Sequence, residues 1–177
     1  MPGATFLSGE SVDLRTIEKD DLEFVRDTVN DPAVRRNLAS SVPCNMAMED
    51  WFENRVSKGD DVKLLIWADG ERVGNIGLNG LDATHGHAEV GYFVASGHQG
   101  RGYGGDALRT LTRYAFEERR LRTIYAHVFS FNEASTRLLE SVGYEHTGRI
   151  PDWGFADGEY HDALIYAATA DDWSSSG

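Results

Sequence analysis

A run of glycines, four of them within residues 100–105, separates a strand-like segment from a helix-like segment. The segment before it, residues 88–95 (AEVGYFVA), alternates as a strand does, and the segment after it places Ala107, Leu108 and Leu111 on one face of a helix. So many glycines ahead of a helix cost backbone entropy. They let a pyrophosphate approach the backbone closely, where the N–H groups of the helix N-terminus bind its charge. The chain is therefore predicted to contain a phosphate-binding strand–loop–helix unit.

The same letters allow two interpretations of this loop. Gly100, Gly102 and Gly105 spell G-x-G-x-x-G, the dinucleotide pattern, whereas Gln99 with Gly102 and Gly104 spells Q-x-x-G-x-G. A dinucleotide fold needs the unit early in its domain and an acid at the end of the second strand. Here residues 1–87 precede the unit, and the next strand-like run ends in HVFSFN without an acid. No G-K-[ST] follows either, so the second interpretation is favoured.

The remaining pattern predicts one α+β domain over residues 1–177, with short flexible ends at 1–8 and 172–177. Asp69-Gly70 between two strand-like runs indicates a hairpin. We expect a central mixed, mostly antiparallel sheet of about seven strands, flanked by about four helices, with one parallel unit at 88–129. The expected strands are 11–17, 62–68, 71–81, 88–95, 122–129, 144–150 and 159–169, and the expected helices are 20–31, 46–60, 105–120 and 132–142.

The charge balance limits the partners. There are 29 acidic against 17 basic residues, a net charge of −12, which repels nucleic acid and anionic membranes. Two explanations fit this balance: attraction of a cationic substrate, or a solvated acidic surface like that of halophile proteins. The even spread of the acidic residues along the chain favours the second explanation. With no long apolar run and no leader, we expect a cytoplasmic protein without a membrane span. The lone Cys44 cannot form an internal disulfide and is interpreted as structural rather than as an acyl carrier.

Two stretches carry further motifs: GYFVASGHQGRGYGGDAL joins a strand to a Q/R-x-x-G-x-G/A loop, and NEASTRLLESVGY has N-x-x-S/A followed by a helix and Gly-Phe/Tyr. In this order and spacing they resemble the two motifs of the GNAT superfamily of N-acetyltransferases. DGEYHDALIYA resembles the ribosomal-protein alanine acetyltransferases of the RimJ/RimL type. The resemblance covers residues 9–170 in element order and implies the GNAT fold, in which the middle strands splay apart.

The resemblance also implies an activity. The chain would move an acetyl group from acetyl-CoA, its co-substrate, directly to a primary amine. A protein N-terminal α-amine is the first expectation; a polyamine, aminoglycoside or amino acid is the alternative. Another acyl donor and a non-catalytic acyl-CoA-binding sensor stay open, and a homodimer is a family-level expectation.

The resemblance places the coenzyme on named residues. The pantetheine arm would pair with backbone of the 88–95 strand, the loop amides would hold the pyrophosphate, and the Asn132 side chain would contact the coenzyme while capping its helix. Arg101 would add charge at the phosphates or lie on the surface. The expected coenzyme-binding residues are Phe93, Val94, Ala95, Gln99, Gly100, Arg101, Gly102, Tyr103, Gly104, Gly105, Asn132 and Ser135.

The leaving thiolate needs a hydrogen-bond donor, and the backbone N–H of Val94 would hold the oxyanion. Many relatives place a tyrosine donor where this chain has Leu139. Ser135 matches the serine of the ribosomal-protein subgroup and is the candidate donor, with helix capping as its alternative role.

The general base has two candidates. Glu89 lies on the strand face opposite Val90 and Tyr92, and His127, five residues before Asn132, carries a side chain that titrates near neutral pH. A half-buried structural histidine and a water relay are the alternatives. The subgroup has an acid where Gly154 stands here, with Asp152 and Asp157 nearby.

The other histidines and tryptophans carry weaker signals. His85, His87 and His98 are interpreted as polar turn residues, so no metal is expected. The acceptor would bind between the segment 37–51 and the hairpin after Ile150. In these two segments, Trp51 is expected in the core, and Trp153 either lines the cleft or packs in the core.

Overall fold

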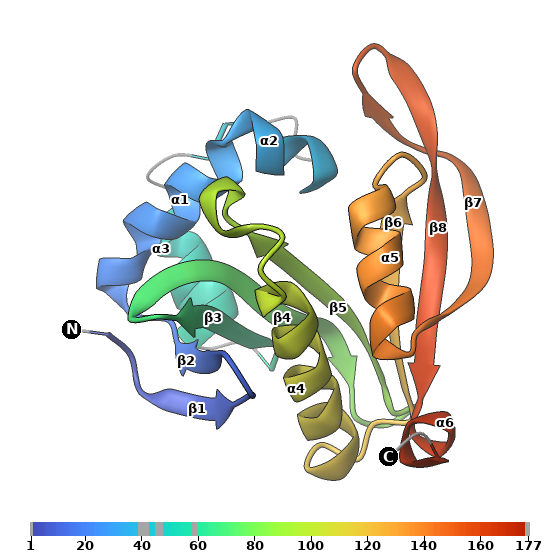
Figure 1. Cartoon of the computed structure of the whole chain (residues 1–177), viewed down its shortest axis with the longest axis horizontal. Helices are drawn as coiled ribbons and strands as arrows, with labels where there is room; N and C mark the ends of the chain where they lie inside the picture. Colours follow the sequence, from blue (N-terminus) through green and yellow to red (C-terminus); the bar gives the residue numbers. More distant parts are fainter. Residues whose placement is uncertain (1, 39–42, 45–47, 58–59, 176–177) are drawn as a thin grey trace.

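The computed structural model describes residues 2–38, 43–44, 48–57 and 60–175. Within them, eight strands form one sheet in the order β1-β2-β3-β4-β5-β6-β8-β7, antiparallel throughout except between β5 and β6 (Figure 1). The strands are β1 Thr5–Ser8, β2 Asp13–Thr16, β3 Val62–Ala68, β4 Glu71–Asp82, β5 His87–Val94, β6 Thr123–Phe129, β7 Glu145–Ala156 and β8 Glu159–Thr169. The expected α+β class and the mixed, mostly antiparallel sheet are confirmed, with eight strands in place of about seven.

Helices cover both faces of this sheet. The α-helices are α1 Leu22–Asn30, α2 Pro32–Arg35, α3 Met48–Trp51, α4 Tyr103–Glu117, α5 Glu133–Val142 and α6 Ala170–Ser175. Shorter turns are η1 Lys19–Asp21, η2 Arg36–Leu38 and η4 Ser96–His98, and the π-helical η3 Phe52–Ser57 continues α3. The helix expected over 46–60 is thus α3 plus η3, and residues 45–47 and 58–59 lie outside the described part. No helix of the described ranges is long and apolar enough to cross a membrane.

The two ends of the chain differ from expectation. Residues 1–8 were predicted to be flexible, but Thr5–Ser8 form β1, which pairs with β2 from Thr5↔Arg15 to Ser8↔Asp13. At the other end, α6 includes residues 172–175. Strand β7 also runs on to Ala156, past the predicted end at residue 150, across an irregularity between Ile150 and Gly154. Strand β1 is missed because it is short, and the second half of β7 is missed because Pro151 interrupts the alternation.

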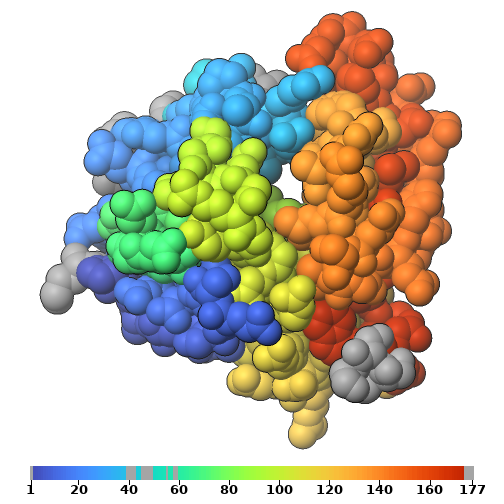
Figure 2. All heavy atoms as spheres, viewed as in Figure 1, coloured from blue at the N-terminus to red at the C-terminus, as the bar shows by residue number. Residues whose placement is uncertain are grey.

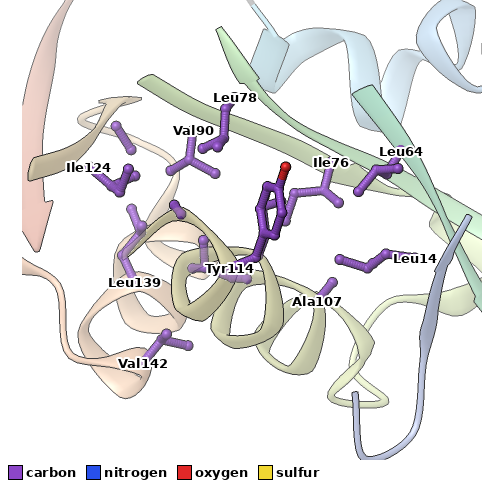
Figure 3. Packing of buried hydrophobic residues seen from close by; sticks show 14 of the residues in the cluster. Leu14, Leu64, Ile76, Leu78, Val90, Ala107, Tyr114, Ile124, Leu139 and Val142 are labelled. Carbon is purple, nitrogen blue, oxygen red and sulfur yellow. The ribbon is translucent and has the colours of Figure 1, made fainter. Parts of the chain in front are cut away.

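Alternation along the strands gives the sheet a core on each face. Leu64 and Ile66 of β3 pack in the larger core with Leu111 of α4, and Leu65 between them packs on the opposite face with Val25 of α1. Figure 3 shows the larger core, where α4 and α5 lay apolar side chains over the sheet. The sheet is therefore packed against helices on both of its faces.

Asp106, in the first turn of α4, ties the N-terminal strands to this helix. Its carboxylate accepts hydrogen bonds from the backbone N–H groups of Glu10, Ser11 and Val12 at 3.1, 2.6 and 3.0 Å, and from the Ser11 hydroxyl at 3.0 Å. Burial raises the pKa of Asp106, but these bonds to the charged form outweigh it and hold the pKa below its usual range. The β1–β2 turn is thereby fixed against the start of α4.

The middle of the sheet is split. Strands β5 and β6 pair only from His87↔Thr123 to Glu89↔Tyr125, after which β5 stays paired with β4 up to Val94 and β6 with β8 up to Phe129. Beyond Glu89 the two strands diverge, as Figure 1 shows. The predicted splay is confirmed, and it opens the sheet beside the glycine loop.

Candidate active site

A pocket of about 570 Å³ lies where β5 and β6 diverge. It is bounded by β5, the glycine loop, the start of α4, β6 and the first turns of α5, and Figure 2 shows the surface hollowed between the loop and α5. Of the residues expected to bind the coenzyme, the pocket is lined by Phe93, Val94, Gln99, Gly100, Arg101, Gly102, Tyr103, Gly104, Gly105, Asn132 and Ser135. The structure therefore gathers all but one of them, Ala95, around one space.

The glycine loop has the conformation that its sequence suggests. Gly100 and Gly102 have φ values of +75° and +84°, in the left-handed region that favours glycine. The first hydrogen bond of α4 runs from Asp106 N to Gly102 O at 3.1 Å, so the preceding N–H groups of the helix have no acceptor within it. The residues that carry these N–H groups line the pocket, and free N–H groups at a helix N-terminus are suited to binding a pyrophosphate.

Gly104 serves packing as well as binding. A Cβ atom at this position would lie 2.9 Å from Cδ1 of Leu138 on α5. The absence of a side chain lets the start of α4 approach α5 closely, so that the loop and α5 form two walls of one pocket.

Along β5, the backbone available to a ligand is narrower than expected. Ala95 donates its N–H to Val73 O at 2.8 Å and accepts from His98 N at 2.9 Å, so its backbone is already bonded, and it lies outside the pocket. Along an antiparallel pair, the backbone N–H and C=O groups of successive residues point alternately toward and away from the partner strand. The backbone groups of Phe93 and Ala95 therefore point toward β4, whereas those of Val94 point into the gap left by β6. The backbone of Ala95 is therefore already engaged within the protein. Of the three expected strand residues, Val94 is the one whose backbone turns toward the gap, and its carbonyl accepts from Nε2 of Gln99 at 2.9 Å.

The first turn of α5 forms the opposite wall. Asn132 accepts a hydrogen bond from the backbone N–H of Ser135 at 3.2 Å, which makes it the N-cap of α5 as well as a lining residue. The Ser135 hydroxyl lies 2.6 Å from the hydroxyl of Tyr92. Leu139, at the position where many relatives carry tyrosine, is fully buried in the core.

Tyr92 is a pocket residue that the sequence did not single out. Alternation along β5 places Tyr92 on the face that packs against α4 and α5, so the sequence alone suggests a core residue. The structure instead brings its hydroxyl to the lining of the pocket. Burial raises the pKa of this hydroxyl to about 12, although the bond to Ser135 opposes the shift, so the group stays protonated at neutral pH.

The two candidate bases meet on the other face of the sheet. Nδ1 of His127 lies 2.8 Å from Oε1 of Glu89, and the imidazole stacks on the Trp153 ring with centroids 5.3 Å apart at 6°. Both residues line the main pocket and also an adjoining hollow of about 320 Å³ beside Trp153. The splay therefore connects the glycine loop on one face with a carboxylate–imidazole pair on the other.

The acids near the last hairpin do not replace this pair. A Cβ at Gly154 would lie 2.4 Å from the ring of Phe129, so an acid at this position would require that ring to move. Asp157 pairs with Nε of Arg36 at 2.6 Å, and the backbone N–H of Asp152 bonds Asp162.

Two of the histidines expected in turns each lie near a single carboxylate. His87 is 4.0 Å from Asp82, and His98 is 3.9 Å from Glu71. Among the described residues, no group of three or more histidine, cysteine, aspartate or glutamate side chains is arranged to hold a metal.

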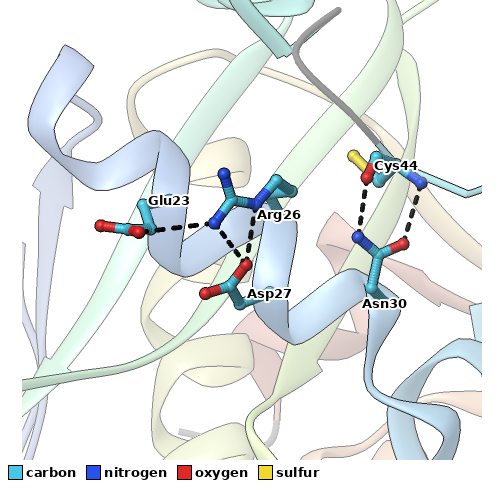
Figure 4. A network of polar contacts seen from close by, with 5 residues as sticks. All are labelled: Glu23, Arg26, Asp27, Asn30 and Cys44. Carbon is cyan, nitrogen blue, oxygen red and sulfur yellow. Dashed lines mark hydrogen bonds and ion pairs between the residues drawn. The ribbon is translucent and has the colours of Figure 1, made fainter.

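Cys44 is held by α1. The Asn30 side chain donates to Cys44 O at 2.7 Å and accepts from Cys44 N at 2.8 Å, next to the Arg26–Asp27 ion pair (Figure 4). Burial raises the pKa of the thiol, partly offset by the charge of Arg26, so the thiolate is disfavoured. This environment suits a structural cysteine. The part of the acceptor segment at 39–42 and 45–47 lies outside the described residues.

The two tryptophans of the expected acceptor region differ in their surroundings. Trp51 packs against the smaller core with Val25 and Leu65, as expected. Trp153 is 53% exposed and covers His127. It therefore borders the hollow rather than the core.

Known proteins match this chain over most of its length. A family model described as an acetyltransferase (GNAT) domain matches residues 11–145. The spermidine N(1)-acetyltransferase of Escherichia coli (strain K12) is 24% identical over 158 residues, 89% of this chain and 85% of that protein. A Bacillus subtilis protein provisionally named a ribosomal N-acetyltransferase is 33% identical over 105 residues, 59% of this chain and 57% of that protein.

Solved structures share the fold. The spermidine N-acetyltransferase from Vibrio cholerae, in a complex with CoA and spermine, superposes with a TM-score of 0.86 at 21% identity. The match covers 93% of this chain and 98% of that one.

Proposed function

The chain belongs to the acetyltransferase (GNAT) family and is an N-acetyltransferase, and on this premise we propose that its acceptor is a primary amine of a small polycation of the polyamine class. A protein N-terminus, which the sequence resemblance placed first, becomes the second candidate. Similarity to the Escherichia coli spermidine enzyme over 89% of this chain supports the first acceptor. Similarity to the provisionally named ribosomal enzyme, at 33% identity over a shorter region, supports the second.

The observation that carries the proposal is the carboxylate–imidazole pair under an exposed indole. Glu89 and His127 lie 2.8 Å apart at the open side of the pocket, and Trp153 stacks on the imidazole. An ammonium group is attracted by a carboxylate and by the face of an indole. The net charge of −12 adds a long-range attraction for polycations over singly charged amines.

The coenzyme site is proposed on the glycine side of the same pocket. The amides that precede Asp106 N in α4 would hold the pyrophosphate of acetyl-CoA, as the left-handed Gly100 and Gly102 allow. The N–H of Val94, turned into the gap, would hold the oxyanion, and its carbonyl oxygen, which accepts from Gln99 at 2.9 Å, has a second lone pair for the extended arm. Asn132 would contact the arm from α5.

The proposed base is the pair rather than either residue alone. If Glu89 accepts from Nδ1–H of His127, Nε2 is left to take the proton of the incoming amine. The new bond joins the amine nitrogen to the acetyl carbon, the carbon–sulfur bond breaks, and its electron pair stays on sulfur. Ser135 would donate a hydrogen bond to that sulfur.

The test is the release of free CoA thiol from acetyl-CoA with a panel of acceptors: spermidine, spermine, an aminoglycoside, and peptides with Ala, Ser or Met N-termini. We expect saturable release with the polyamines. Gly102→Val should raise the KM for acetyl-CoA by about tenfold or more, because a side chain would project where the phosphate binds and strain a left-handed backbone.

Gly143→Val is the matched control. Gly143 has φ +105° and open space around it, so it carries a similar backbone strain at the C-terminal end of α5, outside the pocket lining. Release with peptides alone would move the proposal to the protein N-terminus. Equal effects of the two glycine variants on the KM for acetyl-CoA would contradict the loop assignment.

A further inference from the structure

We infer that Tyr92 is a positioning residue for the leaving sulfur: its hydroxyl donates to Ser135, which directs the Ser135 hydrogen at the sulfur of the coenzyme. The inference deepens the proposed function and rests on its coenzyme site. It supplies from β5 the phenol that the chain lacks at Leu139, whose side chain is buried in the core.

The two hydroxyls approach each other from facing walls of the pocket. Tyr92 belongs to β5 and Ser135 to the first turn of α5, and their oxygens are 2.6 Å apart. Both line the pocket on the side of the glycine loop, together with Val94 and Asn132. A ligand running from the loop along β5 therefore passes this pair.

Hydrogen counting leaves one donor for a third atom. Each hydroxyl has one hydrogen, so the bond between them consumes one and leaves one. A phenol is the better donor to an aliphatic alcohol, so Tyr92 donates and the Ser135 hydrogen is left over. Accepting a bond polarises the serine O–H and strengthens its own donation.

A second tyrosine–hydroxyl pair in the same protein shows what a purely structural arrangement looks like. Tyr144 and Thr112 lie 2.7 Å apart, but Thr112 also donates to Leu108 O at 2.7 Å, so both hydrogens are used inside the core. Within the described residues, the structure gives no acceptor for the hydrogen of Ser135. The Tyr92–Ser135 pair can therefore donate a hydrogen bond to a ligand in the pocket, whereas the Tyr144–Thr112 pair has no hydrogen left to donate.

The chemistry asks for a hydrogen bond rather than a full proton transfer. With its pKa raised to about 12 by burial, Tyr92 stays protonated, whereas a thiol of ordinary pKa, about 8.5, leaves as a much weaker base. The amine proton goes to His127, and the sulfur keeps the electron pair of the broken bond. The serine–tyrosine pair then stabilises the charge that grows on sulfur.

The kinetic test uses Tyr92→Phe, Ser135→Ala, the double variant and Tyr144→Phe. Each single change at the pair should lower kcat by about tenfold, with the KM for the amine unchanged, since only the departing sulfur is affected. Because the two act as one unit, the double variant should be no more than about twofold worse than Ser135→Ala. Tyr144→Phe also removes a buried hydroxyl bond and should retain its kcat.

A binding arm does not depend on the acceptor. By calorimetry at about pH 9, where an ordinary thiol is largely ionised, the wild type should bind CoA more tightly than desulfo-CoA, which lacks the sulfur. Tyr92→Phe should lose most of that preference and Tyr144→Phe should keep it. If no amine in the panel is acetylated, the proposed function fails while this arm still decides the role of Tyr92.

Two results would overturn the inference. One is a Tyr92→Phe enzyme that matches Tyr144→Phe in both kcat and preference for CoA. The other is a double variant whose loss of kcat is the product of the single losses, because independent donors, not a relay, would then act on the sulfur.

Discussion

At the scale of the residue, His127 is held by contacts on two sides. Glu89 fixes one ring nitrogen at 2.8 Å, and the Trp153 ring lies parallel to the imidazole. A base held in one orientation needs no reorganisation when the amine arrives, which is the benefit of a fixed catalytic geometry. The pair therefore has to be tested as a unit.

His127→Asn should lower kcat/KM by about 100-fold, the ordinary contribution of a positioned general base. Glu89→Gln should cost less, since the amide oxygen can still accept from Nδ1–H while the negative charge is lost. The measurement is kcat/KM against pH for the best amine of the panel. His85→Asn, in the turn between β4 and β5, is the matched histidine control. Unchanged pH profiles in both site variants would show that neither residue is the base.

Single residues differ in how far the sequence could place them. Glu89 and His127 were separate alternatives, because only the parallel register that sets Glu89 opposite Tyr125 brings them together. That the N–H of Ala95 bonds Val73 could not be foreseen, because the β4–β5 register that uses this N–H is not visible in the sequence. Tyr92 was passed over because a tyrosine on an inward strand face normally reads as core.

At the scale of the element, the join between the N-terminal strands and α4 depends on one carboxylate. Asp106 accepts hydrogen bonds from three consecutive backbone N–H groups of the β1–β2 turn, so these three donors depend on its carboxylate. Such bonds to a charged, nearly buried group are worth more than neutral ones, and leaving them unmade is costly. The same residue anchors α4, the helix that follows the glycine loop.

Asp106→Asn should destabilise the protein by about 1–3 kcal/mol at neutral pH, because an amide offers one acceptor oxygen to several donors. The folded pKa of Asp106 is lowered, so its contribution is present above the unfolded value of about 3.9 and is lost as the pH falls through the folded pKa. Urea unfolding across this range should show the gap between wild type and variant closing in acid.

Asp171→Asn provides the control for that series. Asp171 pairs with Arg122 at 3.2 Å, but both side chains are largely exposed, so its removal should change the free energy of unfolding little at any pH. A gap between wild type and Asp106→Asn that stays constant into acid would contradict the assigned role of the charge.

The elements with strong local signals were predictable. The Asp69-Gly70 hairpin appeared as β3 and β4, and Asn132 and Gly143 bound α5 as N-cap and C-cap. The divergence of β5 and β6 was expected only from the family resemblance, because no local pattern states where two parallel strands stop pairing. Propensity acts over neighbouring residues, whereas pairing partners are set by tertiary packing.

At the scale of the whole molecule, the net charge of −12 acts on both the fold and the substrate. Like charges spread over the surface repel one another and oppose the compact state, while they attract cations from solution. Both effects are screened by salt, so ionic strength should change stability and acceptor binding in opposite directions.

Raising NaCl from about 0.1 M to about 1 M shortens the Debye length from about 10 Å to about 3 Å. We expect the Tm to rise, because self-repulsion is screened. The KM for spermidine should rise as well, and by a larger factor than the KM for a singly charged amine. A Tm that is flat or falls with salt would contradict the first expectation, and equal factors for the two amines would contradict the second.

The divergence of β5 and β6 has a consequence for how the chain avoids sticking to itself. Unpaired strand edges are the backbone surfaces that recruit other chains into aggregates. In this sheet two such stretches turn toward each other inside the molecule, with α5 along one wall and the glycine loop at the mouth. An extended small molecule can lie between them as a strand would, but a foreign sheet cannot reach both. The feature that makes room for a ligand thereby also keeps an adhesive part of the backbone out of contact with neighbours.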